Sequence, residues 1–174
     1  MKLNLGCGKK TEKGYINADI VNLKGVDKVF DFNKYPFPFK DNTFEEIKIT
    51  NAIHCVENLI LFMNEISRVC KNGAIIKIKS QFFLSPESAC DPLTKTNIGY
   101  NSFNLFLKNP EEKMGASYDS KAKFKILKRK WIFSENKYLK WLNFIPNLSP
   151  RFYSRFLYFY FPSNKLYFEL QVIK

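Results

Sequence analysis

The start of the chain places a glycine turn between two short apolar stretches. A strand is predicted over residues 2–5, and it runs directly into Gly6 and Gly8. A second predicted strand ends in a carboxylate at Asp19, eleven residues after Gly8. Glycine lets the backbone turn sharply and approach a ligand because it has no Cβ. A carboxylate at the tip of the next strand can accept both hydroxyls of a ribose. The pattern therefore predicts a nucleotide-cofactor site, although Gly-x-Gly after a strand, taken alone, is equally compatible with a turn that has only a structural role.

The spacing of these residues argues against two common ligands. A dinucleotide site needs a third glycine and an acidic residue about 20 positions further on. Here Thr11 occupies the third glycine position, and Asp19 comes much sooner. No Gly-x-x-x-x-Gly-Lys-Ser/Thr loop, which would cradle the phosphates of ATP, occurs in the chain. NAD and ATP are therefore both disfavoured.

Further along, the apolar pattern predicts strands that alternate with a helix. Short isoleucine-rich strands are expected at Ile47–Thr50 and Ala74–Lys79, and a weaker one at Val26–Phe30. Between the first two, apolar residues repeat at helical spacing from Asn58, a predicted N-cap, to the stop signal at 71–73. Strand, helix and strand in this order favour a parallel sheet with right-handed crossovers.

The polar candidates all follow predicted strands. Gly6, Asp19, Asp31 and Asn51 each come directly after one or end it. Ligands of parallel sheets lie outside the carboxyl ends of the strands. We therefore expect these four residues to meet at one edge of the sheet.

The second half of the chain is less regular. Residues 80–120 hold no long period, and we interpret them as a substrate loop or lid. Partial alternation predicts a strand over Lys121–Trp131, and Lys165–Lys174 alternates like a closing strand. The residues between them, 132–164, form an aromatic-rich insertion that includes Arg151–Phe161. The length of 174 residues favours one domain over 1–174.

The amino-acid composition limits which cellular compartment and which binding partners we expect for this chain. Four cysteines without a Cys-x-x-Cys pair and a single histidine disfavour a metal site and favour reduced thiols. No secretory signal or membrane span is visible, so we expect a cytoplasmic protein. Residues 88–174 carry 15 Lys and Arg against 6 Asp and Glu, a basic surface that an anionic group could approach. Nucleic acid is disfavoured, because only Phe124 and Trp131 interleave the lysines of 121–130 and both are expected in the core.

Five segments between residue 3 and about residue 79 form an ordered series of motifs. They are LNLGCG (3–8), GYINAD (14–19), FPFKDNTF (37–44), AIHCV (52–56) and EISRVCKNG (65–73). In this order they resemble class I S-adenosylmethionine-dependent methyltransferases of the small methyltransferase type 11-like group. The resemblance implies an α/β fold, a Rossmann-like three-layer sandwich. Its seven-stranded sheet would be mostly parallel, with the last strand antiparallel.

The resemblance also implies roles for single residues. The glycines would face the methionine part and ribose of S-adenosylmethionine, Asp19 the ribose hydroxyls, and Asp31 the adenine amino group. The full cofactor-binding set is Asn4, Gly6, Cys7, Gly8, Asp19, Ile20, Asp31, Phe32 and Asn51. One departure concerns Asn4, which stands where the family carries an acidic residue. An amide cannot form an ion pair with the cofactor's ammonium group.

Two residues are candidate catalytic bases. His54 is the only histidine, and imidazole exchanges protons near neutral pH. It could instead have an architectural role next to the following helix. Asp91 lies in the predicted substrate loop and could also take a proton, although an Asp before Pro often only forms a turn.

Ser85–Phe106 and the tail to Lys174 resemble, less specifically, methyltransferases of this group that are linked to surface-glycan genes. This looser resemblance implies a methyltransferase that acts on a hydroxyl of a sugar, glycan or other small anionic or lipid-linked acceptor. A non-catalytic S-adenosylmethionine-binding protein and an RNA-associated methyltransferase or binder remain as alternatives. Aromatic and leucine side chains beside basic ones in Arg151–Phe161 leave three roles open: contact with a membrane surface, with a dimer partner, or with the core. The sequence is compatible with a monomer or a homodimer.

Overall fold

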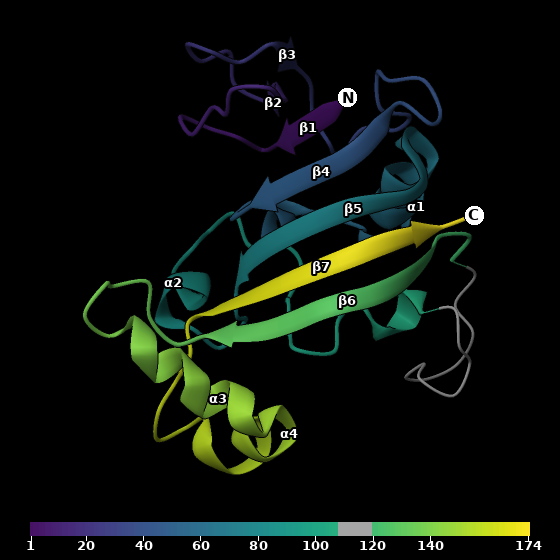
Figure 1. Cartoon of the computed structure of the whole chain (residues 1–174). Helices are drawn as coiled ribbons and strands as arrows, with labels where there is room; N and C mark the ends of the chain where they lie inside the picture. The colour runs from purple at the N-terminus through teal and green to yellow at the C-terminus, as the bar shows by residue number, and fades with distance from the viewer. Residues whose placement is uncertain (108–119) are drawn as a thin grey trace.

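A single seven-stranded sheet organises the chain (Figure 1). The computed structural model describes residues 1–107 and 120–174, so part of the predicted substrate loop lies outside the described residues. The strand order is β3-β2-β1-β4-β5-β7-β6. The strands are β1 (Lys2–Leu5), β2 (Ile16–Asp19), β3 (Lys28–Val29), β4 (Phe44–Thr50), β5 (Cys70–Gln81), β6 (Lys123–Ile132) and β7 (Lys165–Ile173).

The first five strands are parallel, and the last strand runs against its neighbours. The pairs β1–β2, β1–β4, β2–β3 and β4–β5 are parallel, whereas β7 is antiparallel to both β5 and β6. The predicted α/β fold, with a mostly parallel seven-stranded sheet and an antiparallel last strand, is therefore confirmed. Since β6 and β5 both oppose β7, they point the same way. The carboxyl ends of β1 to β6 consequently meet at one edge of the sheet.

One face of the sheet forms the core. Every second residue of the central strands is apolar and buried there: Leu3, Leu5, Ile47, Ile49, Ile76, Ile78, Phe168 and Leu170. Helix α1 (Leu59–Val69) adds its buried stripe to the same core through Phe62, Met63, Ile66 and Val69. Asn58 caps this helix by accepting hydrogen bonds from the backbone N–H groups of Ile60 and Leu61, as the sequence predicted.

The opposite face of the sheet is polar. It carries the alternate residues of the same strands, among them Lys48, Lys77, Tyr167 and Glu169. The Nζ atom of Lys77 lies 3.0 Å from a carboxylate oxygen of Glu46 on β4. In Figure 1, α1 lies behind the sheet and no described helix crosses in front of it. Among the described residues no helix forms a third layer on this face, because the connections over 6–15 and 20–27 form turns.

Short elements make the remaining connections. They are η1 (Ile53–Cys55), α2 (Pro86–Ala89), η2 (Asn104–Phe106), η4 (Lys140–Asn143), α3 (Phe144–Leu148), α4 (Pro150–Phe152) and the π-helical turn η5 (Tyr153–Leu157). Elements α3 and α4 project beyond the end of β6 at the margin of the molecule (Figure 1). None of the helices within 1–107 and 120–174 is long and apolar enough to cross a bilayer.

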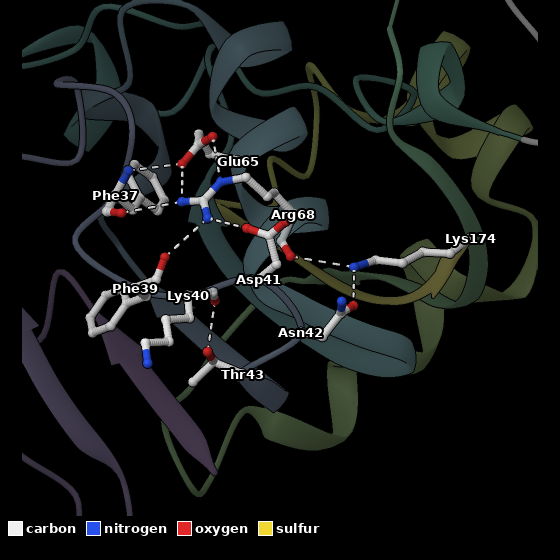
Figure 2. Close-up of polar contacts among 9 residues, drawn as sticks. All are labelled: Phe37, Phe39, Lys40, Asp41, Asn42, Thr43, Glu65, Arg68 and Lys174. Carbon is white, nitrogen blue, oxygen red and sulfur yellow. Dashed lines mark hydrogen bonds and ion pairs between the residues drawn. The ribbon is translucent and has the colours of Figure 1, made fainter.

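An ion pair on α1 holds the segment that leads into β4 (Figure 2). Arg68 forms a bidentate pair with Glu65, with N–O distances of 2.9 and 2.7 Å. Its guanidinium also donates to the carbonyl oxygens of Phe37 and Phe39 and to the carboxylate of Asp41. Glu65 in turn accepts from the backbone N–H of Phe37 at 2.8 Å. The i, i+3 pair is therefore a clamp on the FPFKDN motif as well as a pair on the helix surface.

Candidate functional site

The glycine turn after β1 is fixed by a close approach to the loop after β4. Gly6 has a positive φ of +67°, and a Cβ added there would lie 2.4 Å from the Cβ of Ala52 and 3.7 Å from the ring of Phe32. Any larger residue would push the two loops apart. Gly8 also has a positive φ, of +52°, but a Cβ added there would meet nothing within 4 Å. Gly6 thus allows the two loops to pack against each other, whereas Gly8 faces open space.

The backbone amides of this turn bind the end of β2. Gly6 and Cys7 donate to the carbonyl oxygen of Ala18 at 2.8 and 3.1 Å. Gly8 donates to a carboxylate oxygen of Asp19 at 2.7 Å. A phosphate-binding turn presents free N–H groups to its ligand. Because these three amides already have partners, the turn suits a ligand without phosphate.

Asp19 lies at the tip of β2 with acceptor capacity left. Its second oxygen accepts from the backbone N–H of Val21 at 3.1 Å, so each oxygen holds one hydrogen bond. A carboxylate has about four acceptor sites, which leaves room for two hydroxyl donors. The neighbouring Ile20 and Val21 expose their apolar side chains beside it. The arrangement can receive a diol together with a flat apolar group.

Asn4 braces the turn from below. Its buried Nδ2 donates to the carbonyl oxygen of Lys10 at 2.9 Å and to Oδ1 of Asn17 at 3.0 Å. The same Asn17 oxygen accepts from the backbone N–H of Glu12, and Asp27 accepts from the backbone N–H of Asn17. The sequence did not single out Asn17, because a polar residue in a short strand has no distinctive pattern. Both acceptors facing Asn4 require a donor, which an acidic residue at this position would not supply.

The ends of β3 and β4 complete the edge. Asp31 accepts from the backbone N–H of Asn33 at 2.9 Å, and the ring of Phe32 packs edge-on against Phe62. Asn51 follows β4 in the left-handed conformation, with φ of +52°. Its Oδ1 is buried and has no hydrogen-bond partner among the described residues. A buried carbonyl oxygen of this kind is a candidate acceptor for a ligand donor.

The two candidate bases contact each other. His54 Nε2 lies 3.1 Å from a carboxylate oxygen of Asp91, whose other oxygen accepts from the N–H of Leu93. The His54 side chain is only 3% exposed, whereas that of Asp91 is 23% exposed. The second ring nitrogen of His54, Nδ1, is enclosed and has no hydrogen-bond partner in the part of the chain that the structure describes. The backbone carbonyl of His54 also accepts from the N–H groups of Lys95 and Thr96, so this residue fastens the segment that follows Asp91 to the end of β4.

A cleft of about 280 Å³ opens next to the glycine turn. Among the predicted site residues, Asn4, Gly6 and Cys7 line it. The other lining residues are Lys10, Glu12, Lys48, Thr50 and Lys79, which the sequence did not identify. Lys48 and Lys79 resemble solvent-facing strand residues in the sequence, and only the sheet register brings them to the turn. Three lysines against one glutamate favour a ligand with a negative charge.

Cys7 is not prepared for nucleophilic chemistry. Burial raises the pKa of its thiol, and the nearby negative charge of Asp19 raises it further. A neutral thiol is a weak nucleophile. Cys7 therefore serves the turn through its backbone. Within 1–107 and 120–174, no three His, Cys, Asp or Glu side chains gather as a metal ion would require.

Comparison with solved structures identifies the fold. No family model and no curated protein sequence matches the chain. An S-adenosylmethionine-dependent methyltransferase from Mesorhizobium loti has a TM-score of 0.58 at 10% identity, with 98% of this chain and 89% of that chain covered. Phosphoethanolamine N-methyltransferase 2 from Haemonchus contortus, solved with S-adenosyl-L-methionine, has a TM-score of 0.59 at 11% identity over 99% of this chain and 48% of that one.

A third solved structure with this fold belongs to a protein that is named for a different reaction. It is the [4+2]-cyclase SpnF, with a TM-score of 0.58 at 13% identity and coverage of 99% and 75% of the two chains. The chain described here thus has the fold of class I S-adenosylmethionine-dependent methyltransferases. At identities of 10–13% the similarity establishes the fold but not the activity, which has to be argued from the residues of the site.

Proposed function

We propose that this protein binds S-adenosylmethionine at the carboxyl edge of β1 to β4 and transfers its methyl group to an acceptor hydroxyl. The observation that carries the proposal is the glycine turn whose amides are occupied and which lies beside the Asp19 carboxylate. A cofactor with a ribose and no phosphate can donate its hydroxyls to the carboxylate, and it has no phosphate that would require free backbone N–H groups. The fold shared with S-adenosylmethionine-dependent methyltransferases supports the proposal, because the turn follows β1 and Asp19 ends β2 of the parallel part of the sheet.

The residues at this edge fit the cofactor in three respects. Asp19 retains acceptor sites for the two ribose hydroxyls. Phe32 and the exposed Ile20 offer apolar surface for the adenine ring, with Asp31 as an acceptor for its amino group. Asn51 Oδ1 is a buried acceptor that no described residue contacts by a hydrogen bond, which suits the cofactor's ammonium group.

The protein's own part in the reaction is orientation and proton transfer. When bound, S-adenosylmethionine supplies an electrophilic methyl group on a sulfonium sulfur. The acceptor oxygen gains the methyl group and loses its proton. We infer that Asp91 takes this proton, because its carboxylate is partly exposed whereas His54 is enclosed. His54 acts as a positioning residue that holds one carboxylate oxygen by a hydrogen bond.

The acceptor we infer is a sugar, glycan or similar molecule that carries a negative charge. The support is the cleft beside the glycine turn, in which Lys10, Lys48 and Lys79 outnumber Glu12. Lys48 is paired with Glu12 and Lys79 with Glu135, so each already has one anionic partner. The side chain of Lys10 is the most direct candidate to meet a carboxylate or phosphate of the ligand.

Calorimetric titration with S-adenosylhomocysteine tests the cofactor site. We expect binding by the natural protein and a loss of at least about tenfold in affinity for Asp19→Ala, since two hydrogen bonds to a charged group disappear. Glu45→Ala is the matched control, because Glu45 is an exposed carboxylate at the amino-terminal end of β4. Absence of binding by the natural protein, or equal binding by Asp19→Ala, would defeat the proposal.

Turnover with a panel of anionic sugars tests the proton acceptor. Asp91→Asn should lower kcat with little change in the affinity for S-adenosylhomocysteine. His54→Asn should lower kcat less and shift the pH profile, because the carboxylate would remain but lose its ring partner. If Asp91→Asn retained full activity, the base would have to be sought elsewhere.

A non-catalytic S-adenosylmethionine-binding protein is the second candidate function. Two sequence departures favour it: Asn4 in place of the acidic residue, and Ile53 in place of the glutamate before His54. SpnF illustrates that this fold also occurs in a protein described as a cyclase. Cofactor binding without methyl transfer to any member of a broad acceptor panel would favour this candidate.

An RNA-associated role has weaker support. Lys125, Lys128 and Lys130 project from β6 without a hydrogen-bonding partner among the described residues. Phe124 and Trp131, the aromatic residues of the same strand, are both buried and unable to stack on bases. RNA binding that keeps sequence preference at raised salt would be needed to revive this role.

A further inference from the structure

The segment after β6 exposes an unusual amount of apolar surface. Residues 138–161, which we name the aromatic cap, include η4, α3, α4 and η5. Leu148 is 82% exposed, Phe159 and Tyr160 are each 78% exposed, and Trp141 is 65% exposed. The other exposed large apolar residues of the cap are Tyr138, Leu139, Phe144, Ile145, Phe152, Phe156 and Phe161. Isolated exposed apolar residues are ordinary, but a cluster of this size marks an interaction surface.

The cap is held in place by its own buried side chains. Tyr153 and Tyr158 are buried and pack against Trp131 of β6. The hydroxyl of Tyr153 donates to the backbone carbonyl of Phe161 or to Ser163. Asn147 accepts from the N–H of Trp131 at 2.9 Å and donates to its carbonyl oxygen at 2.8 Å. The exposed rings therefore belong to a scaffold anchored on the sheet.

The charge of this segment has one sign. From residue 136 to residue 168 the sequence contains no Asp or Glu. The same stretch carries Lys137, Lys140, Arg151, Arg155 and Lys165. Lys165 is paired with Glu135, whereas the other four lie on or next to the exposed apolar residues. Cationic side chains beside exposed aromatic and aliphatic ones are the composition that binds an anionic lipid surface.

We propose that the aromatic cap docks this protein on the surface of an anionic lipid bilayer. Its aromatic and leucine side chains enter the boundary between headgroups and acyl chains, and its Lys and Arg side chains meet the lipid phosphates. The cap begins at the carboxyl end of β6, on the same sheet edge as the glycine turn.

Charge disfavours a second copy of this chain as the occupant. A two-fold dimer would place the same patch on both sides of the interface. The cations of two caps would then face each other without an acidic residue from 136–168 to pair with them. Nucleic acid is also disfavoured, because Leu148, Leu139 and Ile145 add aliphatic surface that cannot stack on bases.

Tryptophan emission provides a local test, because the two tryptophans differ in environment. Trp131 is 1% exposed and Trp141 is 65% exposed. We expect the emission to shift to the blue on addition of phosphatidylcholine vesicles that contain phosphatidylglycerol. Brominated lipids should quench it. Trp141→Phe should abolish both responses while the protein still sediments with the vesicles.

Sedimentation with the same vesicles tests the two parts of the surface. The double variant Leu148→Ser, Phe159→Ser should lower the partition coefficient by about tenfold or more, because two apolar anchors are lost. The control Leu61→Ser, Leu127→Ser replaces two exposed leucines outside the cap and should leave it unchanged. Arg151→Gln, Arg155→Gln should weaken binding to the anionic vesicles, whereas Lys9→Gln, Lys13→Gln should not.

Three results would overturn the proposal. The first is no binding to anionic vesicles by the natural protein, or equal binding to neutral ones. The second is a concentration-dependent blue shift of Trp141 without lipid together with a dimer in light scattering, which would assign the cap to a second copy. The third is the same blue shift on addition of short RNA with no response to vesicles, which would assign it to nucleic acid. Unchanged circular dichroism of every variant controls for folding.

Discussion

Asn4 illustrates how one side chain can be fixed by its neighbours rather than by a ligand. Its amide donates to two oxygens, those of Lys10 and Asn17, in a buried position. We predict that Asn4→Asp lowers the free energy of unfolding by about 2–3 kcal/mol, because a carboxylate donates to neither oxygen and buries a charge. Urea unfolding measures this, with the exposed Asn22→Asp as the control. An Asn4→Asp protein of natural stability that bound S-adenosylhomocysteine more tightly would show that the position serves the cofactor instead.

Asn51 allows stability and binding to be separated at one position. Its left-handed φ suits glycine, and its buried Oδ1 has no hydrogen-bond partner within 1–107 and 120–174. We expect Asn51→Gly to leave the unfolding free energy unchanged or slightly raised, but to weaken S-adenosylhomocysteine binding by about 2–10-fold through one lost hydrogen bond. Asn51→Ala should weaken binding equally and also lower stability by about 1 kcal/mol, because alanine is strained at this φ. Undiminished binding by both variants would remove Asn51 from the site.

The sequence singles out candidate site residues at strand ends and overlooks polar residues within strands. Gly6, Gly8 and Asp19 are candidates because ligands of parallel sheets lie at the carboxyl ends of strands. In the structure Gly8 donates to the Asp19 carboxylate, and Gly6 donates to the carbonyl oxygen of Ala18. Asn17 and Lys79 lie inside strands, where a polar residue in an alternating pattern resembles any solvent-facing position. Their place beside the glycine turn depends on strand register, which no local pattern specifies.

At the scale of elements, the Glu65–Arg68 clamp joins helix α1 to the loop before β4 (Figure 2). Hydrogen bonds from Arg68 lower the pKa of Glu65 below its usual 4.5, although burial acts in the opposite direction. A carboxyl whose pKa is lower in the folded state stabilises the fold above its unfolded pKa. That contribution is lost as the pH falls from about 4.5 through the lower folded value.

We therefore predict that Glu65→Gln costs about 1–2 kcal/mol near neutral pH. The difference from the natural protein should shrink in acid, where Glu65 itself becomes protonated. Urea unfolding over a series of pH values measures both effects. Glu57→Gln is the control, because Glu57 is exposed and pairs only with Lys95. A difference that stayed constant at all pH values would mean that the charge of Glu65 has no part in the clamp.

Regular elements were predicted from their period, and the irregular ones were not. The helix over 59–69 and the strands at 123–132 and 165–173 agree with their sequence patterns to within a few residues. The structure of segment 132–164 could not be predicted in this way, because some of its aromatic residues are buried and others are exposed. Tyr153 and Tyr158 anchor it, whereas Phe159 and Tyr160 face solvent, and composition alone does not tell them apart.

Across the whole molecule, the sheet has one apolar face and one polar face. The cross-strand pair Ile76–Leu170 lies in the core, and the next pair, Lys77–Glu169, lies on the polar face. The Ile-Lys alternation of β5 is thus the signature of a sheet covered on one side only. In a sheet covered by helices on both faces, the lysine positions would read as apolar too.

The exposed face leads to a last prediction. Lys77→Val, Glu169→Val should leave the fold intact but cause self-association, because the two valines would create an apolar patch on the polar face of β5 and β7. Light scattering coupled to size exclusion measures the association. Ile76→Ala, Leu170→Ala, on the neighbouring pair, should instead lower stability by several kcal/mol without association, since the cavity it leaves lies in the core. If the valine variant remained monomeric and gained stability, some part of the chain would have to cover this face in solution.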